Sequence, residues 1–483
     1  MSLGHMLLTR KLIAQEQLDA AVMRQKMAGG RLEDHLIALG EVTQEQVGAI
    51  RQEPPHVPQS IPETGLEAPF LLRSILKAMF ILGVETIPTL AQHLALSKRI
   101  IEELLQMARK EGLVEIRGAV DSSLTVLRYA LTGAGRERAL EALQRSHYVG
   151  PVPVSLADYR SQVQKQTVTN ERVASETLAA ILSHLVLPQD VLRQLGPAVN
   201  SGKPLLLYGP SGNGKTSIAE AIGEAFQQTV YIPYCIEVGG SIIKIFDPVV
   251  HLPVSLASAA NGTGESLGAL APTDSDPRWV RCRRPVIISG GELTLDMLDL
   301  KLDPISHDYE APLQVKATGG VFVIDDFGRQ LVRPRDLLNR WIAPLEKKVD
   351  YLTLHTGKKF DVPFDEFIVF STNLAPEDLM DAAFLRRVHY KLFIGPPSAE
   401  DYAALFHRVC TLRGLELPQT VLSYIQTAFY TKTQTRAAAF HPKFIVEHIV
   451  SSCAYEGIPP RFTEEMLKDA LQNLLIVDEN AEG

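Results

Sequence analysis

The sequence predicts a doubly wound α/β fold with a parallel sheet, preceded by small helical domains and followed by a small bundle of helices. Three observations carry this prediction. From Pro188 onward, short apolar segments alternate with helical patterns, as in a parallel sheet whose strands are joined by helices. The first apolar segment spans residues 204–208, and a glycine-rich turn follows it. Beyond residue 396, apolar residues recur with helical spacing as far as residue 476.

The composition excludes several classes of protein. The chain has 483 residues, of which 46% are hydrophobic and 22% are charged, an ordinary globular composition for about three domains. Its formal net charge of −8 excludes a chain-wide basic surface for nucleic acid or anionic lipid. Four scattered cysteines without a C-x-x-C pair indicate neither a zinc ribbon nor a disulfide framework, and no apolar run is long enough for a bilayer. Since a signal-peptide pattern is also missing, we expect a soluble cytoplasmic protein.

Residues 1–53 contain an internal repeat with an offset of 29 residues. The offset places Leu7 on Leu36 and Ile13 on Val42, and the apolar spacing within each unit is helical. One such unit cannot bury its own apolar face. We therefore expect the two units to pack together as one helical domain.

A capped helix lies within this repeat, and a proline-rich linker follows the repeat. Thr43, followed three residues later by Gln46, predicts a capping box that opens a helix. Residues 54–65 contain four prolines. This composition predicts an extended, semi-rigid spacer.

Residues 66–145 predict the plan of a winged helix-turn-helix domain. Helices are expected at 68–83, 87–96 and 98–112, and strands at 113–118 and 124–131. Ser97 would cap the third helix, and Gly112 would end it. The exposed side of this helix carries glutamates as well as lysines and arginines, and the domain holds 11 basic and 9 acidic residues. This balance favours protein contact over DNA binding, although DNA stays an alternative.

The remaining chain divides into a linker, a core and a lid. Residues 146–187 predict a mostly helical, polar linker, and residues 188–395 predict the α/β core. Core strands are expected at 204–208, 229–232, 321–324 and 367–371. An insertion at 233–320 contains a small, polar stretch, 255–277, that predicts a mobile loop. Residues 396–476 predict the helical lid.

The glycine-rich turn reads G-P-S-G-N-G-K-T-S and has the spacing of a P-loop, or Walker A motif. Such a loop points successive backbone N–H groups at phosphate oxygens, and the helix that follows directs its positive end to the same place. Lys215 would reach the β and γ phosphates, and the Thr216 hydroxyl would hold Mg²⁺. The residues expected to bind the nucleotide here are Gly209, Pro210, Ser211, Gly212, Asn213, Gly214, Lys215, Thr216 and Ser217.

Two later strands end in polar residues that suit the same site. The apolar segment 321–324 delivers Asp325, which would hold the magnesium shell, and Asp326 beside it. The segment 367–371 leads to Asn373, which could orient the attacking water or touch the γ phosphate. Ligands of doubly wound sheets bind at the carboxyl ends of strands, so these groups should meet the P-loop. Asparagine is also a common turn residue, and that alternative stays open.

The order of these motifs resembles that of AAA+ ATPases over residues 168–476. The resemblance rests on the P-loop, the Asp-Asp strand, Asn373 and the helical lid. It implies binding of ATP with Mg²⁺ and hydrolysis of ATP. The family usually has glutamate at the position of Asp326, whose carboxylate polarises the attacking water, whereas replication-initiator and helicase-loader branches also carry aspartate. The resemblance is therefore compatible with turnover that is slow, and a nucleotide switch without turnover is the alternative.

Two further roles follow only from this resemblance. The segment 381–398 is similar to the one that carries the family's arginine finger, which places Arg387, together with Arg386, at the nucleotide of a neighbouring subunit and implies a ring of six subunits. The segment 437–450 is similar to the start of the helix that carries the second sensor, where this chain offers Lys443 in place of arginine. Solvated basic side chains at helix ends are the alternative in both cases.

The insertion resembles the MoxR-like and enhancer-binding branches, where a Gly-Gly turn precedes the Asp-Asp strand. Residues 278–293 are expected to form a hairpin. Its arginines could line a ring pore or make a basic subunit contact. They are Arg278, Arg281, Arg283 and Arg284.

The repeat at 1–53 resembles the N-terminal domain of type II secretion and type IV pilus assembly ATPases, which binds cyclic di-GMP in some members. Four positions agree with that motif: Gly4, Gln25, Arg31 and Gly40. Four positions depart from it: Ser2, Lys11, Glu33 and Pro54. One of two arginines that would grip guanine or phosphate is therefore missing, and we expect docking of a protein partner rather than cyclic di-GMP binding.

Together these features predict an ATP-hydrolysing AAA+ protein that forms an oligomeric ring and remodels or assembles a protein complex of the secretion, pilus or motility type. The alternatives are a winged-helix DNA-binding ATPase that acts as a regulator or loader, and a nucleotide switch that does not hydrolyse.

Overall fold

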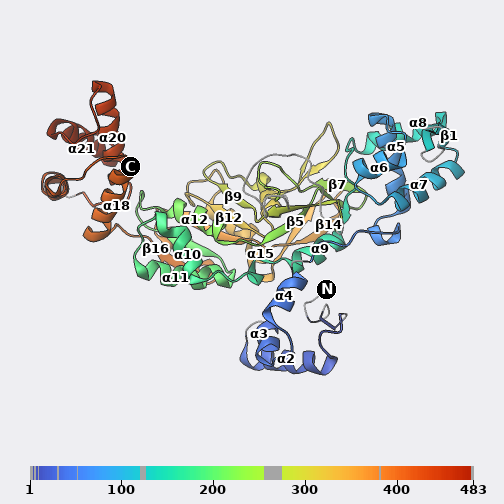
Figure 1. Cartoon of the computed structure of the whole chain (residues 1–483), viewed down its shortest axis with the longest axis horizontal. Helices are drawn as coiled ribbons and strands as arrows, with labels where there is room; N and C mark the ends of the chain where they lie inside the picture. The colour runs from blue at the N-terminus through green and yellow to red at the C-terminus, as the bar shows by residue number, and fades with distance from the viewer. Residues whose placement is uncertain are drawn as a thin grey trace.

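The structure is a computed structural model that describes residues 1–483 except 1–3, 5–6, 9, 30–31, 52, 120–126, 255–274, 380–381, 434 and 480–483. Figure 1 shows an elongated molecule with most of its strands in the middle. The helices α5 to α8 lie at one end, the C-terminal helices lie at the opposite end, and the N-terminal helices project from one side. None of the helices in the described ranges combines the length and the apolar character needed to cross a membrane.

The N-terminal helices form one small core, as the repeat predicts. They are α2 (Gln15–Ala28), α3 (Leu32–Ala38) and α4 (Gln44–Arg51). Leu7 and Leu36 are both fully buried in the same cluster, which also holds Ile13 and Val42. The two units therefore pack at equivalent positions of the repeat.

The predicted capping box is confirmed. The Thr43 N–H donates to Gln46 Oε1 at 2.8 Å, and the Gln46 N–H donates to Thr43 Oγ1 at 3.2 Å. At the equivalent place in the first unit, the Ala14 N–H donates to Gln17 Oε1 at 2.6 Å. The same side-chain contact therefore opens a helix in both units.

Residues 68–145 form helices around an antiparallel strand pair. The elements are α5 (Ala68–Leu82), α6 (Ile87–Leu94), α7 (Lys98–Lys110), β1 (Val114–Ala119), β2 (Leu127–Leu131) and α8 (Gly133–Arg145). The predicted cap of α7 is present, since Ser97 Oγ accepts from the Ile100 N–H at 3.4 Å. The apolar stripe of α7, from Ile100 to Ala108, is fully buried against the other helices.

The core sheet has five parallel strands in the order β16-β4-β15-β12-β9. Its strands are β4 (Leu205–Tyr208), β9 (Val286–Ser289), β12 (Val321–Ile324), β15 (Phe367–Thr372) and β16 (Tyr390–Phe393). One face packs on α10 (Ser175–Ile181), α11 (Gln189–Ser201) and α12 (Lys215–Ala225). The other face packs around Trp341, between α14 (Pro334–Arg340) and α15 (Ile342–Lys347). The strands that end in Asp325 and Asn373 are neighbours, because β12 pairs with β15.

Two strand predictions are wrong. The segment 229–232 does not join the parallel sheet, because β5 (Thr229–Pro233) pairs antiparallel with β8 (Trp279–Arg283) as a separate ribbon. Residues 278–293 do not form a hairpin, because β9 leaves β8 and becomes the edge strand beside β12. A short apolar run shows that a strand forms, but it does not show which strand will be its partner.

Buried arginines explain why residues 278–293 do not fold back on themselves. Arg284 stands between β8 and β9, and its guanidinium donates to Glu171 Oε2 at 2.8 Å and to the carbonyls of Gln166 and Gly319 at 3.0 and 2.6 Å. Arg278 and Arg284 are only 3% and 5% exposed. These two side chains therefore do not line a pore in this chain.

The insertion and β3 from the preceding linker build a second sheet in the order β10-β11-β7-β6-β3. Its strands are β3 (Val154–Ser155), β6 (Cys235–Val238), β7 (Ser241–Lys244), β10 (Lys301–Leu302) and β11 (Tyr309–Glu310). Beside it lie α9 (Leu156–Lys165), α13 (Leu313–Lys316) and the hairpin of β13 (Val349–Thr353) and β14 (Lys359–Pro363). Most of the stretch predicted to be a mobile loop, 255–274, lies outside the described residues.

The C-terminal helical domain, residues 399–479, has a separate core. Its elements are α18 (Ala399–Leu412), α19 (Gln419–Tyr424), the π-helix η6 (Ile425–Thr431), α20 (His441–Glu456) and α21 (Glu464–Glu479). Short helices α16 (Pro376–Leu379) and α17 (Ala382–Leu385) precede β16 and lead toward this domain.

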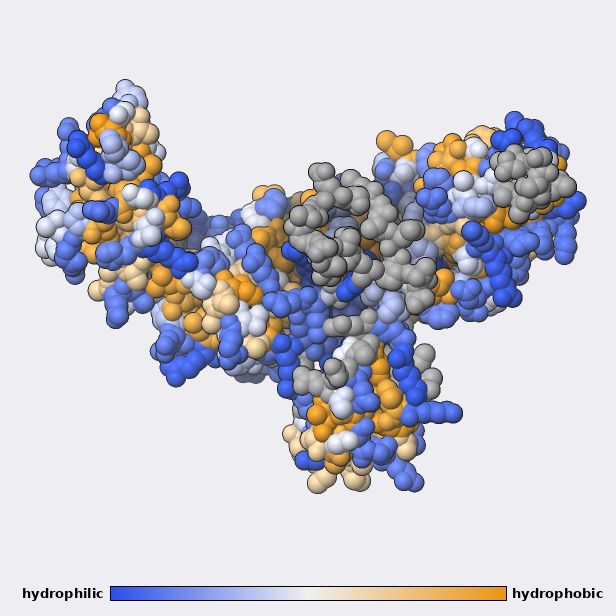
Figure 2. All heavy atoms as spheres, viewed as in Figure 1, coloured by the Kyte–Doolittle hydropathy of each residue, from blue (hydrophilic) through white to orange (hydrophobic). Residues whose placement is uncertain are grey.

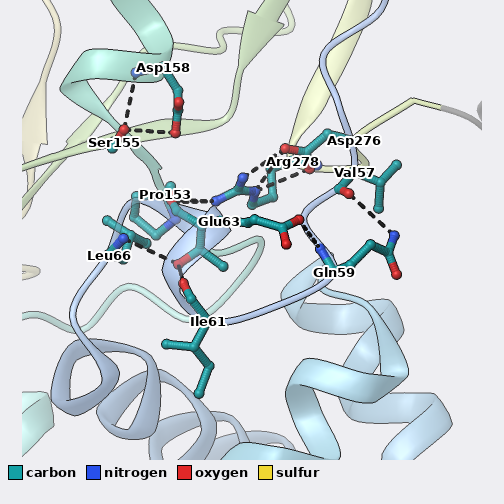
Figure 3. Close-up of polar contacts among 11 residues, drawn as sticks. Val57, Gln59, Ile61, Glu63, Leu66, Pro153, Ser155, Asp158, Asp276 and Arg278 are labelled. Carbon is teal, nitrogen blue, oxygen red and sulfur yellow. Dashed lines mark hydrogen bonds and ion pairs between the residues drawn. The ribbon is translucent and has the colours of Figure 1, made fainter.

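A buried ion pair of the insertion lies against the proline-rich linker (Figure 3). Arg278 meets the Asp276 carboxylate through Nε and Nη2 at 2.8–3.1 Å, and both side chains are almost fully buried. Arg278 Nη1 also approaches the carbonyls of Thr64 and Pro153 at 3.5 and 3.4 Å. The Asp276 N–H donates to the Pro55 carbonyl at 2.9 Å. The linker is therefore bound to the insertion rather than free of it.

Removing one partner of this ion pair should destabilise the protein. In Asp276→Ala the Arg278 guanidinium stays buried without its counter-charge, so we expect a loss of about 3–5 kcal/mol of unfolding free energy. Urea titration followed by intrinsic fluorescence measures it. The control is Asp190→Ala, whose pair with Arg193 is about three-quarters exposed and is worth about 1 kcal/mol or less. Equal losses in the two variants would contradict the expectation.

Candidate nucleotide-binding site

A pocket of about 560 Å³ lies where the P-loop, the ends of β12 and β15 and the C-terminal helical domain meet. Its polar lining comes from the loop residues 211–217 and from Asp325, Asp326, Asn373 and Lys443. Its apolar lining comes from residues 185–187, Leu405, Val409 and Phe440. The structure thus brings together in one pocket most of the residues that the sequence predicts for the site.

Lys215 lies at the centre of the part of the pocket that the P-loop lines. Its ammonium donates to the carbonyls of Gly209 and Pro210, both at 2.8 Å, and to Asn373 Oδ1 at 2.6 Å. Burial lowers the pKa of Lys215, and the nearby carboxylates of Asp325 and Asp326 act against that shift by favouring the charged form. Lys215 begins α12, so a charged group and the positive end of a helix occupy the same corner.

Thr216 and Asp325 form the second contact of the site. Thr216 Oγ1 donates to Asp325 Oδ2 at 2.8 Å, which joins the start of α12 to the end of β12. A hydroxyl and a carboxylate are hard oxygen donors, the kind that Mg²⁺ prefers, and Mg²⁺ usually takes only one or two protein ligands beside phosphate and water. The donor set therefore fits magnesium at this point.

Asp326 and Asn373 lie next to each other in the lining of the pocket. Asn373 Nδ2 donates to Asp326 Oδ1 at 3.3 Å, while its Oδ1 accepts from Lys215. One amide thereby connects the second aspartate to the P-loop lysine. Asp326 adopts φ +47°, in the left-handed region that aspartate enters at a cost.

The C-terminal helical domain contacts the P-loop directly. The Phe440 N–H donates to the Gly212 carbonyl at 3.0 Å, and the Ala439 N–H donates to Asn213 Oδ1 at 3.1 Å. The Phe440 ring lies so close to Gly212 that a Cβ there would be 2.2 Å from it, and Gly212 also has φ +74°. Glycine is thus required at this position, and the side chain of Asn213 is bonded to the C-terminal helical domain.

Arg386 and Arg387 do not line the pocket. Arg386 is exposed, and Arg387 Nε donates to Glu346 Oε1 at 2.6 Å. Lys443, in contrast, lines the pocket from the first turn of α20. Within a single chain, Lys443 therefore lines the pocket and the two arginines do not.

The apolar lining and Gln330 were not predicted from the sequence. Residues 185–187 belong to a loop after a short helix, and Leu405 and Val409 look like ordinary core positions of α18. Only the folded chain places them opposite the P-loop. Gln330 follows the Asp-Asp motif and bonds to it, yet nothing in its residue type distinguishes it from a solvated glutamine.

The repeat domain gives a physical reason for one departure from the dinucleotide motif. Glu33, which stands where the motif has glycine, is buried and pairs with Arg51 at 2.7 Å. Arg51 also donates to the Asn170 carbonyl at 3.1 Å. Glu33 therefore helps attach this domain to the rest of the chain. Ser2 and Arg31 lie outside the described residues.

Comparisons with known proteins give limited similarity. Residues 398–473 match a family described as a domain of unknown function, DUF8689. No curated protein matches the chain. Two solved structures of NtrX from Brucella abortus are similar to it. One, in complex with ATP, has 14% identity and a TM-score of 0.36 over 58% of this chain. The other has 12% identity and a TM-score of 0.35 over 78% of this chain. The matched regions span 54% and 62% of those two chains.

A buried histidine lies beside the contact between α20 and the P-loop. His441 is 1% exposed, and its Nδ1 lies 2.7 Å from the Tyr430 hydroxyl and accepts from the Ala438 N–H at 3.3 Å. The Tyr430 and Tyr402 hydroxyls are 2.8 Å apart. Burial lowers the pKa of His441 to about 4, because the charged imidazolium would lose its hydration.

This histidine should make stability depend on pH. In the unfolded chain its pKa is near 6.5, so between pH 6.5 and 4 the unfolded state binds more protons than the folded state, and stability falls as pH falls. The contribution is complete above pH 6.5 and amounts to about 3 kcal/mol, lost toward pH 4. In His441→Asn, which keeps an acceptor near Nδ1, this part of the pH dependence should disappear.

The measurement is the difference between wild type and His441→Asn in unfolding free energy at several pH values. Taking this difference cancels the contributions of other groups that titrate between pH 4 and pH 6.5. One such group is Asp365, because burial raises its pKa to about 6. A difference that does not change between pH 7 and pH 4.5 would show that His441 is not held neutral.

Proposed function

We propose that this protein binds ATP with Mg²⁺ in the pocket between the P-loop and the C-terminal helical domain and hydrolyses it as an AAA+ ATPase. One observation carries the proposal. Adjacent parallel strands bring Lys215 into hydrogen-bond contact with Asn373, and Thr216 with Asp325, at the carboxyl end of the sheet. Cation, hydroxyl, carboxylate and amide groups in this arrangement match what phosphoryl transfer from a triphosphate requires.

Each side chain would have a distinct role in that reaction. The amides of residues 211–216 and the start of α12 hold the phosphates, and Lys215 exchanges its loop carbonyls for β- and γ-phosphate oxygens. Thr216 and Asp325 hold magnesium, which neutralises charge on the phosphate oxygens. Asp326 would accept a hydrogen bond from the attacking water. Asn373, through its hydrogen bonds to both, would fix the position of the Asp326 carboxylate relative to the Lys215 ammonium.

The other end of the pocket suits an adenine base. Leu405 and Val409 from α18 face residues 185–187, which gives an apolar wall against which a planar base can pack. Within the described lining, the only carboxylates are Asp325 and Asp326 at the phosphate end. A guanine base would call for a carboxylate partner for its N1 and N2 donors. The lining therefore favours ATP over GTP.

Assembly would supply the arginine that the single chain keeps away from the pocket. Arg387, and Arg386 beside it, would reach the nucleotide of a neighbouring subunit in a ring, most simply one of six subunits. Within this chain Arg387 pairs with Glu346, an exchangeable contact at the surface. Lys443 would sense the γ phosphate from the C-terminal helical domain, whose position would change on hydrolysis.

The N-terminal domains would connect the ATPase core to a protein partner in the cytoplasm, as part of a secretion, pilus or motility complex. Apolar side chains of α2 support a protein contact, since Met23 is 67% exposed and Met27 is 86% exposed. Figure 2 shows apolar residues on the surface of this projecting domain. Cyclic di-GMP is a less favoured ligand of the same domain, because Glu33 is engaged with Arg51.

Two alternatives have a specific observation behind them. The exposed face of α7 carries Lys98, Arg99 and Arg109, which could contact DNA and make the protein a DNA-binding regulator or loader, although Glu102 and Glu103 share that face. Asp326 in place of glutamate could leave a nucleotide switch without turnover.

Variants of the pocket test the proposed reaction. Lys215→Ala should weaken MgATP binding at least tenfold, because it removes the cation that pairs with the phosphates. Asp326→Asn should keep binding but lower kcat about a hundredfold, because the water loses its carboxylate. Phosphate release and binding of a fluorescent ATP analogue measure the two effects.

Asp190→Asn, a change at an exposed surface pair, is the matched control and should leave both quantities unchanged. Turnover of Asp326→Asn at the wild-type rate would contradict the role of Asp326. Stimulation of wild-type turnover by duplex DNA would favour the regulator or loader, and nucleotide binding without any phosphate release would favour the switch.

A further inference from the structure

The turn that follows β12 holds Asp326 in an unfavourable backbone conformation. Asp326 has φ +47°, and Gly328 two residues later has φ +107°. A left-handed residue other than glycine costs about 1–2 kcal/mol, so the conformation persists only where neighbouring contacts enforce it. The direction of the Asp326 carboxylate depends on this turn, since φ and ψ at Asp326 decide where its Cβ points.

Backbone contacts fix the two flanks of the turn. On one side the Asp325 N–H donates to the Ser289 carbonyl at 2.9 Å, at the end of β9. On the other side the Phe327 N–H donates to the Ser371 carbonyl, and Thr372 Oγ1 donates to the Phe327 carbonyl, both at 2.7 Å. After the turn, the Leu331 N–H donates to the Gly291 carbonyl at 3.0 Å. The turn is thus held between the carboxyl ends of β9 and β15.

Inside the turn a single side chain spans the strained residue. Gln330 Nε2 donates to the Asp325 carbonyl at 2.7 Å, and Gln330 Oε1 accepts from the Gly328 N–H at 2.7 Å. One planar amide therefore binds the peptide just before Asp326 and the peptide two residues after it. Glycine is required at position 328, because it has φ +107° and a Cβ there would lie 2.5 Å from the Leu379 side chain.

We propose that Gln330 is a positioning residue that aims the Asp326 carboxylate at the site of water attack. This inference rests on the proposed ATPase function and assigns a role in it to a residue outside the P-loop and the Asp-Asp pair. Without the two Gln330 contacts, the peptide that joins Asp325 to Asp326 and the peptide that joins Phe327 to Gly328 lose their side-chain partner, so the turn can relax toward ordinary backbone conformations. Asp326 Oδ1 then moves away from Asn373 Nδ2, which lies 3.3 Å from it in the structure.

The role of Gln330 should appear in the rate and not in nucleotide affinity. The groups that would bind the phosphates and magnesium are the P-loop, Lys215, Thr216 and the Asp325 carboxylate, and Gln330 hydrogen-bonds to none of these groups. Its two side-chain hydrogen bonds to described residues both go to main-chain atoms of the turn. A displacement of about 1 Å at a reacting group can lower a rate about a hundredfold.

The experiment compares Gln330→Ala and Gln330→Met with wild type in the full chain. Methionine keeps the length and most of the volume of glutamine but neither hydrogen bond, so both variants should turn over MgATP 10- to 100-fold more slowly. The Kd for the fluorescent ATP analogue should stay within twofold of wild type, and so should KM. The thermal unfolding midpoint should change by only a few degrees. Gln106→Ala, at an exposed position of α7, is the matched control and should behave as wild type.

Three results would overturn the inference. Turnover of Gln330→Met at the wild-type rate would show that the hydrogen bonds do not position Asp326. A parallel loss of affinity and rate in both variants, or a large fall in the unfolding midpoint, would show a general structural role. If wild type and Lys215→Ala both release no phosphate, the proposed function fails, and this inference fails with it. If wild type hydrolyses ATP and the Gln330 variants do so at the same rate, only the inference about Gln330 fails, and the proposed function stands.

Discussion

The whole site depends on the parallel pairing of three central strands. β4 pairs with β15, and β15 pairs with β12, so that all three end at the same edge of the sheet. At that edge the P-loop leaves β4, Asn373 leaves β15 and the two aspartates leave β12. The hydrogen bonds Lys215–Asn373 and Thr216–Asp325 are consequences of this pairing. A shift of β12 along β15 would move both aspartates away from the lysine and the hydroxyl.

The parts around the core are attached by different kinds of contact. The C-terminal helical domain touches the P-loop through two backbone N–H groups and the Phe440 ring, contacts that can separate and re-form. The linker before α5 is bound to the insertion by hydrogen bonds to Asp276 and Arg278, two buried residues that also form an ion pair with each other. We therefore expect the C-terminal helical domain to move more easily relative to the core than the front helices move relative to the insertion.

Local sequence signals were sufficient where one residue type has one physical use. The cap at Ser97, the capping box of Thr43 and Gln46 and the glycines of the P-loop were all recognisable in this way. Signals failed where a segment had several possible partners. The segment 229–232 is apolar enough for the parallel sheet, yet it pairs with β8, and 286–289 takes the edge of that sheet instead. The arginines beside them looked exposed by type, but Arg278 and Arg284 neutralise buried carboxylates.

By itself, the sequence determined the helical repeat, the P-loop, the strands that carry Asp325 and Asn373, and the helical character of the C-terminal region, because these follow from spacing along the chain. Only the tertiary structure decided the order of the strands, the apolar wall opposite the P-loop, the contact of Phe440 with Gly212 and the clamp of Gln330 on the turn at Asp326. These contacts join residues whose types are common in many environments. Their roles come from the distance between folded segments, which no local pattern encodes.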